Sequence, residues 1–296
     1  MVKKKIFAYV YIYLVLLFLY LPVFYLIVYS FTNSRVTGQW TGFSLDLYRN
    51  LFRDEEIMRA LGNTLILAGI SSLVSTIFGT LGAIGLFYCR KGFRTIIENI
   101  NQIPVVNAEI VIAMSLTVTF VFLGQHFFGG QSIFSFWTLL IGHCCLAIPF
   151  VYLNVKPKLA QMDPALYEAA LDLGSSPTKA IHQVIIPQII PGILSGLILS
   201  FTLSLDDFIV TAFTRGNGLL SKESQIETLS TLVQAKIKKG SVPPAMRALT
   251  TFIFLIVLII VVIYSIKVNH DARKDKKSLG NHSKRRQIYN VNPYEN

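Results

Sequence analysis

The chain has 296 residues, of which 53% are hydrophobic and 15% charged, and its formal net charge is +11. Soluble globular domains carry about 25% charged residues, so this chain has too few to cover a surface that faces water. The high hydrophobicity excludes a disordered protein, and three Cys residues are too few for a disulfide-stapled secreted domain. The composition is that of a polytopic membrane protein.

Six apolar segments reach the length of about 20 residues that a helix needs to cross a bilayer. We expect these spans at about residues 6–29, 61–88, 103–123, 133–155, 191–213 and 249–266. The expected fold class is therefore all-α, with six transmembrane helices in one domain over residues 6–268. Residues 1–5 precede this domain, and residues 269–296 form a basic polar tail that we expect to be disordered.

The orientation follows from the distribution of Lys and Arg, which gather on the cytoplasmic side of membrane proteins. Basic residues precede the first span and fill the tail, and an even number of spans places both termini on the same side. We therefore expect both termini in the cytoplasm of a cell-membrane protein. The basic tail is interpreted as solvated and attracted to the lipid bilayer, and no nucleic-acid partner is expected.

The segment between the fourth and fifth spans, at about residues 156–190, has clear helix start and stop signals. Asp163 is a candidate N-cap and Pro164 suits the first helical position. Gly174 can take the left-handed conformation that ends a helix, and Ser176 is placed to cap a second short helix. The pattern predicts a helix-turn-helix at the inner membrane face, for which an ordinary structured loop is the alternative.

The same segment resembles the EAA loop of ABC-importer permeases. The residues that carry the resemblance, at the family's spacing, are Glu168, Ala169, Ala170, Gly174, Val184, Ile186 and Pro187. The two aliphatic positions are conservative departures from the family's usual Ile and Leu. The resemblance implies a type I importer-permease core in which this loop is the coupling helix that docks on a cytoplasmic ATPase.

The chain has no Gly-x4-Gly-Lys-[Ser/Thr] phosphate loop, so we expect the ATPase to be a separate subunit. ATP and Mg²⁺ are then expected on that partner and no cofactor on this chain, which is expected not to be an enzyme. The implied partners are a homologous permease subunit, an ATPase dimer and an extracytoplasmic substrate-binding protein. No metal site is expected, because His143, Cys144 and Cys145 are adjacent and splay around a helix.

Three carboxylates are expected within spans: Glu109 in the third, and Asp206 with Asp207 in the fifth. An ionisable group there costs about 2.5–3.5 kcal/mol and is a functional candidate. Because no Lys or Arg sits clearly within a span to pair with them, the carboxylates suit a cationic substrate. Adjacent residues lie about 100° apart on a helix, so the sequence leaves open which of the Asp residues faces a pore. Protonated, interhelical or interfacial acids are the alternative.

The run from Leu199 to Phe213 is similar to the fifth span of the second permease subunit of spermidine/putrescine transporters. In that subunit an acidic residue also follows the start of the third span, where this chain has Glu109. The resemblance implies an importer for polyamines. Trp40 is a weaker candidate for the path, as a cation–π partner or an interfacial anchor. A permease of the same family for iron, sulfate or thiamine, and a secondary transporter, remain alternatives.

Overall fold

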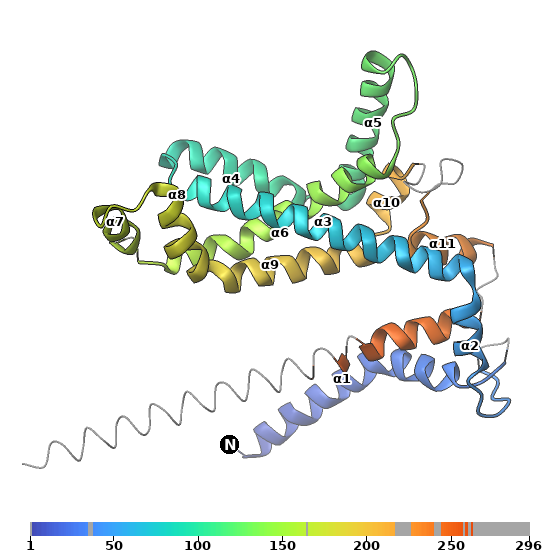
Figure 1. Cartoon of the computed structure of the whole chain (residues 1–296). Coiled ribbons are helices and arrows are strands. Elements are labelled where there is room, and N and C mark those ends of the chain that lie inside the picture. Colours follow the sequence, from blue (N-terminus) through green and yellow to red (C-terminus); the bar gives the residue numbers. More distant parts are fainter. Residues whose placement is uncertain are drawn as a thin grey trace, which may run out of the picture. The chain divides into compact units, whose positions relative to one another are not determined.

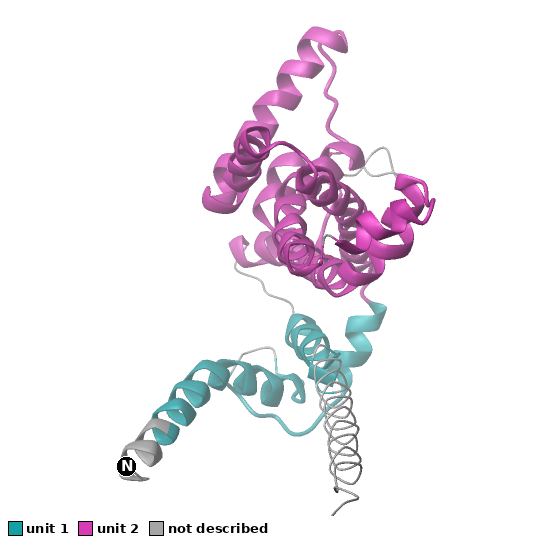
Figure 2. Cartoon of the chain, turned by 90° about the vertical axis from the view of Figure 1, so that its left-hand side faces the viewer, with its two compact units in different colours: residues 1–53, 243–296 teal, residues 54–242 magenta. Residues whose placement is uncertain are grey.

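The computed structural model describes residues 2–34, 38–163, 165–216, 226–239 and 244–256, together with residues 258, 259 and 262; side chains are described from residue 9 onward. The chain divides into two compact units (Figure 2). One comprises residues 1–53 and 243–296, and the other comprises residues 54–242. The regular structure of the described residues is helical without strands, which confirms the expected all-α class.

The described residues of unit 54–242 form ten helical segments. They are α3 (Glu55–Phe87), α4 (Lys91–Val106), α5 (Glu109–Phe127), α6 (Phe136–Gln161), α7 (Ala165–Asp172), α8 (Pro177–Ala180), a π-helical turn η1 (Ile181–Ile185), α9 (Ile186–Asp206), α10 (Ile209–Thr214) and α11 (Leu229–Lys238). Helices α3, α6 and α9 run side by side and pack against one another (Figure 1). Helix α6 is the most buried of the three.

Close approach of these three helices depends on glycine. Val151 of α6 lies between Gly79 of α3 and Gly196 of α9, and a Cβ added at Gly79 would lie 2.7 Å from the Val151 Cβ. At Gly196 an added Cβ would lie 3.1 Å from the Val151 Cγ1. Small residues are the usual means by which membrane helices gain van der Waals contact, since the lipid provides no hydrophobic driving force between them.

Replacing Gly79 by Leu should therefore destabilise the fold, whereas the same change at Gly82 should not. Both residues belong to α3, but a Cβ at Gly82 meets nothing within 4 Å. Overpacking at Gly79 is expected to cost about 1–3 kcal/mol. Thermal unfolding of the two purified variants in detergent measures the difference. Equal midpoints would contradict the close packing of α3 on α6.

Helix α4 corrects the predicted boundaries of the third span. The span was expected at residues 103–123, but α4 covers Lys91–Val106 and a separate helix begins at Glu109. Asn107 and Ala108 between them are extended. A search for a continuous apolar run misses α4 because the helix contains Arg94 and Glu98, which are paired rather than solvated.

The pairing centres on one carboxylate oxygen, Oε1 of Glu98. It accepts hydrogen bonds from Arg94 Nε at 2.9 Å within α4, and from Lys156 Nζ at 2.9 Å and the Tyr152 hydroxyl at 2.7 Å on α6. Burial alone would raise the pKa of Glu98, but the bonds from Arg94, Lys156 and Tyr152 outweigh it and lower the pKa to about 2. Glu98 therefore joins α4 to α6.

This depressed pKa sets a pH window for the stability that Glu98 contributes. A group whose pKa falls on folding stabilises the fold above its unfolded-state pKa, here about 4.5, and loses that contribution as the pH falls through about 2. The unfolding temperature of wild type should exceed that of Glu98→Gln by a constant margin from pH 8 to pH 5. The margin should shrink below about pH 4.5. A margin that shrank near pH 6–7 would contradict the assignment to Glu98.

The fifth span also departs from its prediction. A continuous helical stretch runs from Pro177 through η1 to Asp206, so the span begins well before the expected residue 191. It then stops: Asp207 is extended, and α10 resumes only at Ile209. Asp206 and Asp207 are consequently not successive positions of one helix, as the sequence suggested, but lie on either side of a helix end.

Unit 1–53 with 243–296 contains α1 (Val2–Ser30), α2 (Asp46–Arg53) and a helix at Ala245–Ile256. The guanidinium of Arg247 donates hydrogen bonds to the carbonyl oxygen of Tyr29 in the last turn of α1 and to that of Ser34 in the loop that follows. Phe52 of α2 packs edge-on against Phe252, with ring centroids 5.6 Å apart. These contacts hold the first and last helices of the unit together.

Five described helices are long and apolar enough to cross a membrane: Tyr9–Ser30, Glu55–Phe87, Glu109–Phe127, Phe136–Gln161 and Pro177–Asp206. They correspond to the first five expected spans. The helix at Ala245–Ile256 begins the sixth, whose expected end near residue 266 lies outside the described residues. The tail at 269–296 also lies outside them.

Candidate functional site

The break between α9 and α10 places a carboxylate in the interior of unit 54–242. The side chain of Asp207 is 1% exposed. Its Oδ1 accepts a hydrogen bond from the Val210 N–H at 3.2 Å, and its Oδ2 accepts bonds from the Thr211 N–H at 2.8 Å and the Thr211 hydroxyl at 3.0 Å. The carboxylate thus satisfies backbone donors that the first turn of α10 leaves free.

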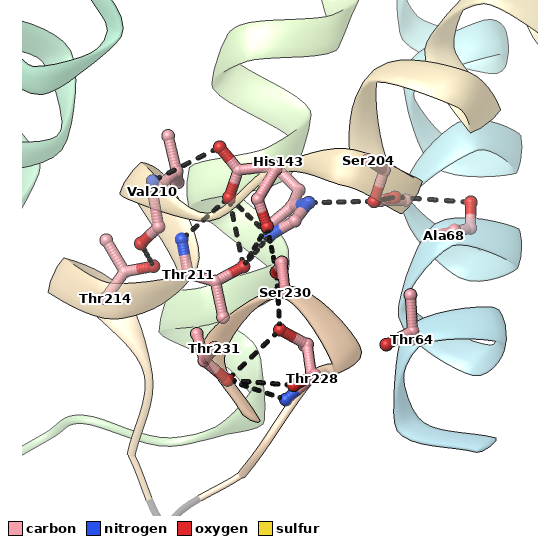
Figure 3. A network of polar contacts seen from close by, with 12 residues as sticks. Thr64, Ala68, His143, Ser204, Val210, Thr211, Thr214, Thr228, Ser230 and Thr231 are labelled. Atoms are coloured by element: carbon pink, nitrogen blue, oxygen red, sulfur yellow. Dashed lines mark hydrogen bonds and ion pairs between the residues drawn. The ribbon is translucent and has the colours of Figure 1, made fainter. Parts of the chain in front are cut away.

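The backbone of Asp207 is fixed from a third helix. Its carbonyl oxygen accepts a hydrogen bond from the Ser230 hydroxyl of α11 at 2.6 Å. The first turn of α11 is itself closed by reciprocal bonds between Thr228 and Thr231 (Figure 3). An interrupted helix at this depth requires such partners, because unpaired backbone groups cannot bond to lipid.

His143 of α6 lies against the same break. Its ring is buried, with Nδ1 2.7 Å from the Ser204 hydroxyl oxygen and Nε2 2.9 Å from that of Thr211 (Figure 3). Nε2 also lies 3.5 Å from Oδ2 of Asp207. The sequence marks His143 only as a possible metal ligand. Nothing in the local sequence links it to Asp207, which is 64 positions away.

Asp206 and Glu109 differ from Asp207 because both residues are exposed. Glu109 is the first residue of α5, which packs against α10 and is bonded to it through the Thr117 hydroxyl and the Phe213 carbonyl oxygen at 3.0 Å. Glu109 interacts electrostatically with both Asp207 and Asp206. The structure therefore brings the three predicted carboxylates into one neighbourhood, where two helix breaks meet.

Trp40 belongs to the other unit. It is 53% exposed, and its ring meets Tyr29 edge-on with centroids 6.4 Å apart. Tyr25 lies beside Tyr29 at 4.4 Å, so the three rings form an aromatic group on the loop side of α1. Arg247 bonds to the backbone of Tyr29 and puts a positive charge next to this group.

The predicted coupling loop forms α7, a tight turn and α8. The Ala165 N–H donates to Asp163 Oδ1 at 3.0 Å, as expected of an N-cap, while Pro164 lies outside the described residues. Gly174 has φ +84°. Its N–H bonds to the Leu171 carbonyl oxygen, and the Ser175 N–H bonds to that of Ala170, which is the Schellman arrangement that ends a helix.

The residues of the Glu-Ala-Ala motif are presented outward. Glu168 and Ala169 are exposed and Ala170 is half-buried, while Leu173 beside the turn is 87% exposed. The opposite side of α7 is anchored by Tyr167, which packs against a hydrophobic core shared by α3, α6 and α9 and lies tilted against Tyr88, with ring centroids 5.1 Å apart. Glu168 and Ala169 are therefore free to meet another molecule without unfolding the loop.

Val184, Ile186 and Pro187, the last residues of the predicted motif, lie where α8 runs into α9. Val184 belongs to the π turn η1, and the Ile186 N–H bonds to the Ile181 carbonyl oxygen five residues earlier. Proline has no N–H and crowds the preceding turn, so Pro187 suits the beginning of α9 that follows this wider turn. The loop thereby continues into α9 as one helical stretch.

No group of three or more His, Cys, Asp or Glu residues in the part of the chain that the structure describes is arranged to hold a metal ion. The polar side chains that meet at the break are chiefly hydroxyls and one imidazole, all engaged with one another. The chemistry of the region is hydrogen bonding and electrostatics.

Comparison with known proteins identifies the family. Residues 75–276 match the family described as binding-protein-dependent transport system inner membrane component. The chain belongs to this family. The spermidine/putrescine transport system permease protein PotC of Escherichia coli (strain K12) is 32% identical over 243 residues, covering 82% of this chain and 86% of the relative. The putrescine transport system permease protein PotI of the same strain is 33% identical over 239 residues, covering 79% and 80%.

Solved structures of permeases share the fold. A bacterial ABC transporter for import of the polysaccharide alginate superposes with a TM-score of 0.67 at 22% identity, covering 92% of this chain and 97% of that chain. An amino acid ABC transporter superposes with a TM-score of 0.52 at 17% identity, covering 76% and 98%. At these identities the likeness shows the fold alone. The expected importer-permease core is confirmed, and the chain is a membrane component of a transport system.

Proposed function

We propose that this permease is the polyamine-translocating subunit of an ATP-driven importer, with spermidine or putrescine as the substrate. One observation carries the proposal: relatives named as spermidine/putrescine and putrescine permeases align over about four-fifths of the chain at 32–33% identity. The clustering of Glu109, Asp206 and Asp207 supports it, since polyamines are cations whose ammonium groups need anionic partners when they leave water.

The energy comes from a partner ATPase that binds ATP and Mg²⁺. The exposed face of α7 supports this, because Glu168 and Ala169 are presented on a short helix that a tight turn joins to the helical stretch from Pro177 to Asp206. Closure of the ATPase dimer would displace α7, and a short rigid helix transmits such a displacement as rigid-body motion. A homologous permease subunit and an extracytoplasmic binding protein complete the proposed assembly in the bilayer.

In the proposed path, Asp206 and Glu109 replace water around the passing ammonium groups. Both side chains are exposed, whereas the Asp207 carboxylate is enclosed and already bonded to α10. Weak interaction at more than one site suits transport, because the cation must also leave. Residues 1–5 and the basic tail at 269–296 are proposed to lie in the cytoplasm, outside the permease domain at 6–268.

Labelled spermidine uptake into proteoliposomes tests the proposal. The vesicles hold this chain with its co-purified partners, and uptake is compared with and without internal ATP. We expect uptake that requires ATP and that putrescine competes away. A co-purifying ATPase without spermidine uptake would support the permease assignment but exclude spermidine, and iron, sulfate and thiamine would become the candidate substrates. Uptake without ATP would instead favour a secondary transporter.

A further inference from the structure

The break between α9 and α10 has a bridge across it that neither helix supplies. Ser204 lies in the last turn of α9 and Thr211 in the first turn of α10, and the two nitrogens of the His143 imidazole bond to these two hydroxyls. The imidazole is a rigid ring, so it fixes how far apart the two helix ends can lie. Figure 3 shows His143 between Ser204 and Thr211.

The hydrogen bonds of this bridge run in one direction. The Ser71 hydroxyl of α3 donates to the Ser204 oxygen at 2.9 Å, and the Thr211 hydroxyl donates to Asp207. If the Ser204 hydroxyl donates to Nδ1 and the Nε2–H donates to Thr211, the hydroxyls of Ser204 and Thr211 each donate one hydrogen bond and accept another. This arrangement assigns a neutral imidazole with its proton on Nε2. It joins α3, α6, α9 and α10.

A second contact holds α10 at the same level of α6. A Cβ added at Gly142, the residue before His143, would lie 2.8 Å from Val210 Cγ1 and 3.1 Å from Thr214 Oγ1. The backbone of α6 therefore lies directly against α10. Neither contact is needed to satisfy the donors of α10, since Asp207 already does so. The bridge instead determines where α10 lies relative to α9.

We propose that His143 is a positioning residue that ties the end of α9 to α10, and that it thereby fixes the direction of Asp206 at the carboxylate cluster. Asp206 lies between Ser204, two residues before it, and Asp207; Ser204 bonds to His143 directly, and Asp207 is joined to His143 through the Thr211 hydroxyl. The continuous helical stretch from Pro177 to Asp206 would carry a displacement of the coupling loop to this joint. With the tie intact, α10 moves together with α9. Without it, the direction of the Asp206 side chain is no longer fixed relative to α10.

Thiol labelling at position 206 tests the tie without reference to any substrate. Cys89, Cys144 and Cys145 are replaced by Ala, Asp206→Cys is introduced, and the full complex in membranes reacts with a cationic methanethiosulfonate. We expect His143→Leu to change the labelling rate about fivefold or more, the effect of losing one hydrogen bond or more. His143→Gln should stay within about twofold of its parent, because its amide keeps a donor and an acceptor.

Two controls separate positioning from general destabilisation. Leu140→Ala removes a buried side chain of α6 that packs toward α3, outside the bridge, and should leave the rate at 206 unchanged. A second reporter, Ser132→Cys in the exposed loop before α6, should react equally in all backgrounds. An unchanged rate in His143→Leu, or an equal change in Leu140→Ala, would overturn the proposal.

Should His143→Leu fail to fold, Thr211→Val removes the α10 end of the tie together with one of the three hydrogen bonds to Asp207, and it should produce the same shift at 206. Polyamine uptake per ATP hydrolysed is then measured on Asp206-containing complexes, a readout that rests on the proposed function. We expect His143→Leu to lower this ratio and His143→Gln to restore it. A labelling shift in a complex that imports no polyamine would refute the proposed substrate while leaving the tie in place.

Discussion

Asp206→Asn should lower ATP-driven polyamine uptake at least tenfold while leaving the amount of assembled permease unchanged. Asp206 is exposed at the end of α9, within electrostatic range of Asp207 and Glu109. An interaction with a charged group contributes about 1.5–3 kcal/mol, which corresponds to a factor of about ten to 150. Uptake at saturating binding protein, normalised to permease in the membrane, is the measurement.

Asp207→Asn should fail in a different way. The Asp207 carboxylate accepts three hydrogen bonds from Val210 and Thr211, and an amide at this buried position would turn a donor toward other donors. An unsatisfied buried group costs about 1–3 kcal/mol. We therefore expect less assembled, monodisperse permease in detergent for Asp207→Asn, before any question of transport arises.

The pair of variants distinguishes a path residue from a structural one. Glu109→Gln should resemble Asp206→Asn, because Glu109 is exposed in the same neighbourhood. Thr202→Val, one turn earlier on the exposed side of α9, removes a hydroxyl that bonds only to the Ile198 carbonyl oxygen and serves as the matched control. Full uptake by both Asp206→Asn and Glu109→Gln would exclude an electrostatic path through these carboxylates.

These differences between neighbours could not be obtained from the sequence. The run around Asp206 and Asp207 contains neither Gly nor Pro, so local signals predict an uninterrupted helix. The interruption depends on tertiary partners: His143 from α6 and Ser230 from α11 occupy the groups that the break exposes. Helix α4 was missed for a related reason, since Glu98 is neutralised by Lys156, which lies 58 positions away.

Local chemistry, in contrast, predicted most of the coupling loop, although the side chain of Ser176 at the N-cap of α8 makes no capping hydrogen bond. Asp163 and Gly174 act through backbone bonds within a few residues, so their roles as N-cap and helix end follow from residue type. The sequence also grouped Glu109 with Asp206 and Asp207, through the rarity of carboxylates in spans and through family resemblance. The sequence could not show which of these carboxylates is exposed and which is buried, because exposure depends on how α5, α9 and α10 pack.

Ala169→Phe should abolish uptake by blocking the docking of the ATPase. Ala169 is exposed on α7, next to Glu168, and a methyl side chain allows another surface to approach the helix closely. A phenyl ring at an exposed position leaves the fold of the loop intact but holds a partner away. We expect the ATPase to be lost from the purified complex and uptake to fall at least tenfold, about 1.4 kcal/mol or more of docking energy.

Gly174→Val should disturb the same coupling between the ATPase and the permease, but through the backbone conformation alone. A Cβ at Gly174 meets nothing within 4 Å, but its φ of +84° is unfavourable for an L-residue and most of all for a β-branched one. The strain, about 1–2 kcal/mol, is relieved only if the turn changes and α7 is presented differently. Both Ala169→Phe and Gly174→Val should therefore abolish uptake, although only Ala169→Phe places a bulkier side chain on the exposed face of α7.

Ser195→Ala, exposed on α9 beyond the loop at residues 156–190, is the matched control and should retain both the ATPase and uptake. Retention of the ATPase together with loss of uptake in Gly174→Val would assign the turn to transmission of movement rather than to docking. If both loop variants kept full uptake, α7 could not be the contact through which the ATPase transmits movement to the carboxylate cluster. The energy would then have to enter the permease elsewhere.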